Sequence, residues 1–172
     1  QKGARTASRS AEGLGSSDFD HLTEAELLSQ LATPSSRRIW LVVEALRKKL
    51  PREKIFQRTH FSSWFLDQLT ELIRIEESLR GSNGKALSDD LLRRAKSDGF
   101  GNVYLAKLTG HSIPALEQMA AKAAIKPHWL RSGCADKPRL FSTYARSGEA
   151  EANTQNKSLL IIGSGAHRVG QG

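Results

Sequence analysis

The sequence predicts a mainly α-helical fold: a bundle-like helical domain, an extended connector, and then the first strand of an α/β domain. Three observations predict it. Apolar residues recur at the spacing of helix faces between residues 22 and 124. Serine or threonine precedes several of these segments, where its oxygen can cap a helix. From residue 125 onward proline and glycine interrupt the periodicity, and the apolar run Leu159–Ile162 then precedes a glycine-rich end.

The first expected elements are the end of a helix and a short capped helix. Residues 1–9 are expected to be the end of a helix, which Gly13–Gly15 would break. Thr23 and Glu26 have the spacing of a capping box, in which each side chain accepts a bond from the other residue's backbone N–H. The helix that they begin is expected to end before Pro34.

Two further helices are expected on either side of Pro51. Ser35 or Ser36 is expected to cap the first of them, which ends at Leu50. Its apolar face consists of Ile39, Val42, Val43 and Leu46. Pro51 suits the first turn of the next helix, over residues 52–57, because its missing N–H is not needed there.

The longest predicted helix spans residues 63–79, with Ser62 as its cap. Its broad apolar stripe consists of Phe65, Leu66, Leu69, Leu72, Ile73 and Ile75. After a loop at 81–84, Ser88 begins a helix that Gly99 ends in a left-handed conformation. Helices over 102–108 and 112–124 complete the domain. Trp40 and Trp64 are placed on apolar helix faces, as core or interface residues.

One segment resembles another at an offset of 50 residues. Ile55, Thr59, Ser62, Leu66, Gln68 and Leu69 correspond to Leu105, Thr109, Ser112, Leu116, Gln118 and Met119. Both segments predict a short helix, a threonine turn, a serine cap and a second helix. Two helical hairpins built by the same packing rules, or a duplication, would explain this.

The C-terminal sixteen residues predict a buried strand that enters a tight loop. A strand without partners cannot satisfy its backbone groups, so we expect the sequence to be part of a longer polypeptide. Gly163 and Gly165 match the first two positions of a dinucleotide fingerprint, but Arg168 occupies the third. The loop also lacks the Lys-Ser/Thr ending of a P-loop.

Composition bounds the functions that the chain can have. The net charge of +8 makes a polyanion worth testing, but the charge is spread. Residues 37–58 hold eight basic residues, and residues 66–77 are net acidic, which favours solvated helix surface or contact with an acidic domain. The single cysteine, Cys134, excludes an internal disulfide and a cysteine zinc site, and it fits a reducing cytosol.

The residues do not predict a catalytic or metal site. The five histidines lack metal spacing, and Cys134 has no partner base in the sequence. No stretch reaches the roughly 18–20 apolar residues of a membrane span, and the N-terminus is not a secretory signal.

A basic helix-turn-helix module that binds nucleic acid is the alternative. Its second helices would carry Arg, Lys, Asn or Gln toward bases. Residues 112–124 offer Gln118 and Lys122 among alanines, while residues 63–79 begin with aromatic and acidic side chains that phosphates would repel. The sequence therefore disfavours this alternative.

Several short motifs, in their order along the chain, resemble one known family. They are Gln1-Lys2 with Gly13-Leu-Gly15, Leu31-Ala-Thr-Pro34, Glu44-Ala-Leu-Arg47, Trp64-Phe-Leu66, Ala95-Lys-Ser-Asp-Gly-Phe100, Leu105-Ala-Lys-Leu-Thr-Gly110, Phe141-Ser-Thr-Tyr144 and Gly163-Ser-Gly-Ala-His-Arg-Val-Gly-Gln-Gly172. Together they resemble the large subunit of carbamoyl-phosphate synthetase, from the end of its first half through its helical oligomerisation domain to the start of its second half.

The resemblance implies a division of the chain and a set of ligand-adjacent residues. Residues 1–15 would end the first synthetase half, 16–126 would form the oligomerisation domain, 127–156 the connector, and 157–172 the first strand and loop of the second half. The loop would lie near the route of the intermediate without supplying an acid or base. Its residues are Gly163, Ser164, Gly165, Arg168, Gly170, Gln171 and Gly172.

The resemblance also implies the chemistry of a parent enzyme. That family makes carbamoyl phosphate from bicarbonate, glutamine-derived ammonia and two ATP, with Mg²⁺ or Mn²⁺ and K⁺, for arginine or pyrimidine synthesis. Both ATP-grasp sites would lie outside this segment, which we expect to be catalytically silent and without a cofactor or metal of its own. The implied partners are the rest of the large subunit, the glutaminase small subunit and further copies in an oligomer. The implied location is the cytoplasm.

Overall fold

The computed structural model describes residues 19–82, 86–132 and 139–144. Within these ranges the elements are α2 (Glu24–Leu31), α3 (Arg38–Arg47), α4 (Arg52–Thr59), α5 (Ser63–Gly81), α6 (Asp89–Ser97), α7 (Asn102–Thr109), α8 (Ile113–Lys122), β1 (His128–Ser132) and β2 (Arg139–Thr143). The mainly α-helical prediction is confirmed. The helix end expected at 1–9, the turn at 13–15 and the strand and loop at 157–172 lie outside the described residues.

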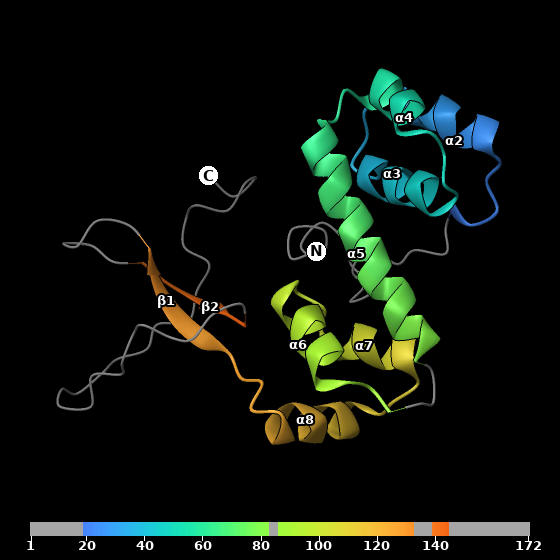
Figure 1. Ribbon diagram of the computed structural model, residues 1–172. Helices are drawn as coiled ribbons and strands as arrows, with labels where there is room; N and C mark the ends of the chain where they lie inside the picture. The colour runs from blue at the N-terminus through green and yellow to red at the C-terminus, as the bar shows by residue number, and fades with distance from the viewer. Residues whose placement is uncertain (1–18, 83–85, 133–138, 145–172) are drawn as a thin grey trace.

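The long helix α5 connects two groups of helices (Figure 1). α3 and α4 pack on its N-terminal half, with α2 beyond them, and α6 and α7 pack on its C-terminal half, with α8 beyond them. We call these groups the first bundle (α2–α4 with residues 63–73) and the second bundle (residues 74–81 with α6–α8). Each bundle has its own core, so α5 belongs to both.

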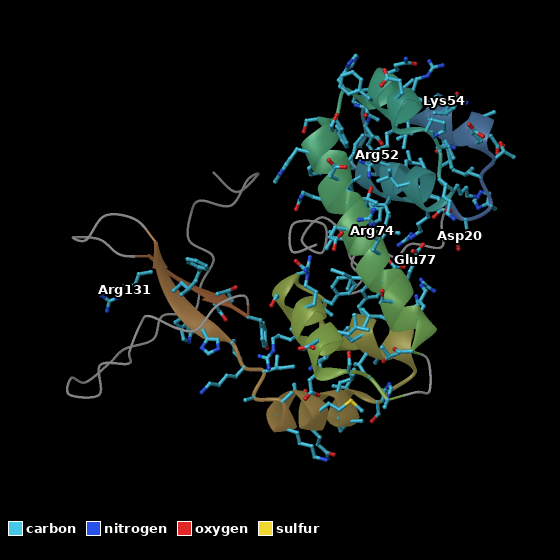
Figure 2. The ribbon with its side chains drawn as sticks, viewed as in Figure 1. Asp20, Arg52, Lys54, Arg74, Glu77 and Arg131 are labelled. Carbon is cyan, nitrogen blue, oxygen red and sulfur yellow. The ribbon has the colours of Figure 1, made fainter. Side chains whose placement is uncertain are left out.

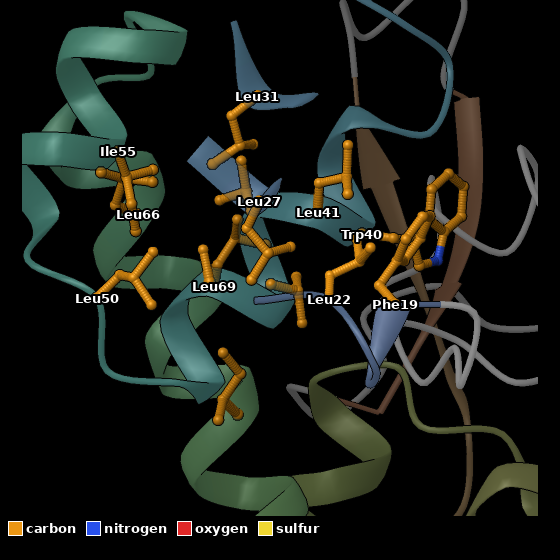
Figure 3. Packing of buried hydrophobic residues seen from close by; sticks show 14 residues of the cluster. Phe19, Leu22, Leu27, Leu31, Trp40, Leu41, Leu50, Ile55, Leu66 and Leu69 are labelled. Atoms are coloured by element: carbon orange, nitrogen blue, oxygen red, sulfur yellow. The ribbon is translucent and has the colours of Figure 1, made fainter. Parts of the chain in front are cut away.

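The first core consists of apolar side chains that the helical spacing aligned. Leu27, Leu31, Val42, Val43 and Ile55 are fully buried there, together with Leu66 and Leu69 from α5 (Figure 3). Burying each of these side chains contributes roughly 1.5–3 kcal/mol.

The second core is built in the same manner around the C-terminal half of α5. Ile75 and Leu79 of α5 pack with Leu92, Leu105 and Leu116. Phe100 and Tyr104 stack at 5.8 Å between ring centroids. Leu72 packs against both cores, so apolar packing continues from one bundle to the other.

The predicted caps are mostly confirmed. Thr23 and Glu26 form the capping box: Thr23 N–H donates to Glu26 at 2.8 Å, and Glu26 N–H donates to Thr23 Oγ1 at 3.3 Å. Ser62, Ser88 and Ser112 each accept a bond from the backbone N–H three residues later, at 3.3 Å in each case.

The cap predicted for α3 is wrong. Its N-cap is Arg37, which makes no side-chain cap bond. Ser35 instead lies in a turn, where its carbonyl accepts from the backbone N–H of Arg38 at 3.2 Å. α3 also ends at Arg47 and not at Leu50, because Lys49 turns into the left-handed region with a φ of 58°.

The 50-residue repeat extends beyond the two predicted hairpins. Thr59 and Thr109 each donate to the carbonyl four residues earlier at 2.8 Å, and His60 and Gly110 follow them with positive φ. Lys49 and Gly99 also correspond, because both have positive φ at a helix end. In both helix ends the next residue donates to a carbonyl five positions earlier, at 3.0 Å from Leu50 and 2.9 Å from Phe100. The two bundles therefore have the same local construction.

A β-hairpin follows α8 in the region expected to be an extended connector. β1 pairs antiparallel with β2, with Leu130 opposite Phe141. Ser97 Oγ donates to the Tyr144 carbonyl at 3.1 Å, and Lys96 Nζ lies 5.5 Å from the Tyr144 ring centroid, which joins the end of β2 to α6. The described residues 128–132 and 139–143 are extended strands, and the sequence did not predict their pairing; most of the rest of the expected connector lies outside the described residues.

The two left-handed helix ends predict opposite effects of substitution. A side chain in this region costs roughly 1–2 kcal/mol relative to glycine. Lys49→Gly should therefore raise the free energy of unfolding by about 1 kcal/mol, while Gly99→Ala should lower it by about 1 kcal/mol. Urea unfolding of both variants measures this. A loss of stability in Lys49→Gly would contradict the strained geometry assigned to Lys49.

Candidate functional site

The loop residues that the sequence predicted as ligand-adjacent lie outside the described part of the chain. They are Gly163, Ser164, Gly165, Arg168, Gly170, Gln171 and Gly172. Their role stays a prediction. The candidate functional features are therefore those of the helical domain: a buried ionic cluster between the bundles, and an exposed aromatic corner on the first bundle.

The buried ionic cluster is centred on Glu76 of α5, which is only 3% exposed. Arg47 of α3 donates from Nη2 to Oε2 of Glu76 at 2.6 Å. Arg80, one turn further along α5, donates to Oε1 at 2.9 Å from Nη2 and at 3.3 Å from Nε. Both carboxylate oxygens thus have a charged donor, which a buried carboxylate requires.

The same cluster reaches Glu44 in the first bundle and Tyr104 in the second. Arg47 Nη1 lies 3.6 Å from Glu44, which is 7% exposed. The Tyr104 hydroxyl on α7 is buried, and among the described residues it lies outside hydrogen-bond geometry to any partner. Side chains from α3, α5 and α7 therefore meet around one carboxylate.

Electrostatics in the cluster follow from burial and from the Glu76 charge. Burial lowers the pKa of the Arg47 guanidinium, but the adjacent Glu76 carboxylate more than offsets this, so the pKa is raised overall. Burial raises the pKa of the Tyr104 phenol far above its usual value, and the Glu76 carboxylate raises it further. Arg47 therefore stays charged and Tyr104 stays neutral.

Glu76 was not predicted as a buried residue, although the sequence contains a signal for it. In the sequence it belongs to the net acidic segment 66–77. Leu69, Ile73, Glu76 and Leu79 are spaced by four, three and three residues, so Glu76 continues the apolar stripe of α5. An acidic residue on such a stripe indicates a buried partner, but the partner Arg47 lies 29 residues away and could not be identified.

Most of the basic residues between 37 and 58 contact other groups of the helical domain itself. Arg52 donates to Asp67 and to Thr70, and Lys54 donates to Glu24 at 3.1 Å (Figure 2). Arg37 lies over the Phe19 ring, and Arg38 donates to two backbone carbonyls. Arg47 donates to the Glu76 carboxylate, and Lys48 donates to two further backbone carbonyls. The expected contact of this basic face with an acidic domain therefore gains no support from these residues.

The exposed aromatic corner lies where α4 turns into α5. We define it by Phe56, His60 and Trp64. Trp64 is 69% exposed and Phe56 41% exposed, and the Phe56 and His60 rings meet edge to face at 5.9 Å. Trp40 is buried in the core as expected, whereas a core position for Trp64 is wrong. Trp64 lies about 140° around α5 from Leu69 and so faces away from the first core, whereas Ile75, at nearly the same angle three turns later, is covered by the second core.

Backbone bonds fix the aromatic corner independently of its rings. Thr59 donates to the Ile55 carbonyl and accepts from the Phe61 backbone N–H at 3.2 Å. Ser62 caps α5 two residues before Trp64. Beneath the turn, the Phe61 and Phe65 rings meet edge to face at 5.3 Å. These bonds hold the turn in place, and Phe56, His60 and Trp64 project from it.

Two remaining features of the described residues concern metal ligands and membrane spans. Within residues 19–82, 86–132 and 139–144, no three His, Cys, Asp or Glu side chains are grouped so that they could hold a metal ion. In the same part of the chain no helix combines the length and the apolar character that a bilayer crossing requires.

Comparison with known proteins gives one consistent family. The carbamoyl-phosphate synthetase large chain, oligomerisation domain, matches residues 1–124. The carbamoyl phosphate synthase large chain of Agathobacter rectalis is 31% identical over 99% of this chain and 16% of that protein. Those of Pseudomonas syringae pv. tomato and Methanosarcina barkeri are 35% and 32% identical, over 90% and 88% of this chain and 15% and 14% of those proteins. The chain thus spans about a sixth of the length of these relatives.

Removal of the Glu76 carboxylate should strongly destabilise the fold. Glu76→Ala leaves the Arg47 guanidinium partly buried without its carboxylate, and we expect a loss of roughly 3 kcal/mol in the free energy of unfolding. Urea unfolding measures this. The control is Glu77→Ala, an exposed neighbour on α5 (Figure 2), which should change stability by less than about 0.5 kcal/mol. Equal effects of the two substitutions would contradict the role of Glu76.

The Tyr104 hydroxyl should make stability depend on alkaline pH. The pKa of the Tyr104 phenol is raised in the folded state, whereas an unfolded tyrosine titrates near about 10. Above that pH the unfolded state releases a proton that the folded state keeps, so the free energy of unfolding falls as pH rises. Tyr104→Phe should reduce this alkaline loss and change stability at pH 7 by less than about 1 kcal/mol. Urea titrations between pH 7 and pH 11 test both. An unchanged alkaline profile would show that Tyr104 is not the group responsible.

Proposed function

The chain belongs to the carbamoyl-phosphate synthetase large-chain oligomerisation-domain family, and from this we propose that it is the central structural segment of a longer large chain. That longer chain would make carbamoyl phosphate from bicarbonate, glutamine-derived ammonia and two ATP. One observation carries the proposal: the family match covers all of α2–α8, while the chain spans only 14–16% of its relatives. The boundaries at residues 15, 126 and 156 remain part of the proposal.

The role proposed for the segment is to connect and position, not to catalyse. Arg47 of α3 joins the buried Glu76 of α5 across the two helices, and it also lies beside the buried Glu44 of its own helix. This arrangement supports a structural role, because each carboxylate already has a cation beside it. ATP, its Mg²⁺ or Mn²⁺, and K⁺ would bind outside the segment.

The proposed partners follow from the same assignment. They are the remainder of the large chain, a glutaminase small subunit, and other copies of the enzyme in an oligomer. The proposed setting is the cytoplasm, in arginine or pyrimidine synthesis. No feature of the described residues favours the nucleic-acid alternative, since Asp67, near the start of α5, pairs with Arg52 and presents an acidic group there.

The mass of the native polypeptide tests the proposed function. An antibody against this segment should detect, in an extract of the source cells, a polypeptide several-fold heavier than 18.9 kDa. The purified segment alone should give no turnover with ATP, bicarbonate and ammonia, whereas the heavier polypeptide with its small subunit should. A native mass near 18.9 kDa would contradict the proposal and direct the next test to salt-dependent DNA binding.

A further inference from the structure

We infer that the aromatic corner, with Trp64 as its main contact, docks into an apolar pocket on another domain of the same longer polypeptide. The inference rests on the proposed function, since it requires that longer polypeptide. It adds a specific surface, a specific residue and an intramolecular partner.

The exposure of Trp64 is not needed for folding of the turn that presents it. The second bundle builds the same turn at an offset of 50 residues, with Thr109 donating to Leu105 and Ser112 capping α8. There the positions of Phe56, His60 and Trp64 are occupied by Ala106, Gly110 and Pro114. The aromatic residues are therefore an addition to the first bundle that its local structure does not require.

The chemistry of the corner fits a mainly apolar partner. Trp64 and Phe56 offer apolar rings, while Glu53, Arg58 and Asp67 around them are exposed and charged. An apolar centre with a charged rim is the arrangement of a protein interface, and tryptophan is enriched among its strongest contacts. The matching pocket would have aliphatic walls and an oxygen that accepts from the indole N–H.

The size of the corner favours a partner within the same polypeptide over a second copy. With 69% of Trp64 and 41% of Phe56 exposed, their open surface is on the order of 250 Å². A stable interface between separate molecules needs about 800 Å² from each partner. A domain tethered in the same chain has an effective concentration near the millimolar range, so a much smaller contact is sufficient. About five sixths of the length of the relatives lies outside this segment and could supply that domain.

Oxidative footprinting of the three tryptophans tests the inference. Hydroxyl radicals are applied to the 172-residue chain and to the longer polypeptide, and oxidation is measured by mass spectrometry. In the 172-residue chain Trp64 and Trp129 should react quickly and buried Trp40 slowly, so that Trp40 serves as an internal reference. In the longer polypeptide oxidation of Trp64 should fall about tenfold, toward the rate of Trp40, because the docked indole loses contact with solvent.

A substitution provides the second readout. Trp64→Ala should leave the thermal midpoint of the 172-residue chain unchanged, because the exposed ring contributes nothing to its core. In the longer polypeptide the same substitution should lower the midpoint by several degrees, while Trp64→Phe should restore part of it.

The possible outcomes separate this inference from the proposed function. A longer polypeptide in which Trp64 oxidises as fast as in the 172-residue chain would overturn the inference alone. Protection of Trp64 that rises with the concentration of the 172-residue chain would overturn it in favour of contact with a second copy. If no longer polypeptide exists, the proposed function fails first, and the inference fails with it.

Discussion

Glu76 sits where α5 passes from the first bundle to the second, and burying its carboxylate constrains how α5 can be placed. Arg80 of the same helix pairs with Oε1 of Glu76, but Oε2 depends on Arg47 of α3, and a carboxylate at this depth is costly unless all its charge is paired. Rotation of α5 by one residue would turn the carboxylate about 100° away from that partner. Apolar side chains tolerate small shifts of a helix more readily than a buried ion pair does. The pair therefore fixes the rotation of α5, and with it the positions of both cores.

The shared helix makes the two bundles one structural unit. Leu66 and Leu69 complete the first core, and Ile75 and Leu79 complete the second, on the same 19-residue helix. The two halves of α5 are not buried independently of each other. Leu72 packs on both cores, and Arg47 of the first bundle pairs with Glu76 in the second. Loss of the ionic cluster should consequently be felt in both cores, in the manner of coupled neighbouring sites.

Local signals in the sequence predicted local structure well, and the failures have identifiable causes. The capping box of Thr23 and the caps of Ser62, Ser88 and Ser112 were predicted because each bond joins residues three apart. The cap predicted for α3 was wrong because Ser35 begins a turn two residues before the actual N-cap, Arg37. The pairing of β1 with β2 and that of Arg47 with Glu76 are non-local, so periodicity carries no information about them. The exposure of Trp64 could not be predicted from its angle around α5 alone, because it lies about 140° from Leu69 but only about 20° from Ile75 of the same stripe. The glycine loop at 163–172 stays a prediction.

The two repeats share the residues that their turns require and differ in the residues exposed on the surface of those turns. Thr59 and Thr109 each donate to the carbonyl four residues earlier at 2.8 Å, and Ser62 and Ser112 each cap the helix that follows. The shared residues are therefore those that the fold of the turn requires. Trp64 and Pro114 occupy equivalent positions in the two turns, but their side chains differ completely. Tryptophan is enriched among the strongest contacts of protein interfaces, where another surface covers its indole. Because the second bundle folds the same turn without one, the reason for Trp64 must lie outside the turn, in what the first bundle contacts.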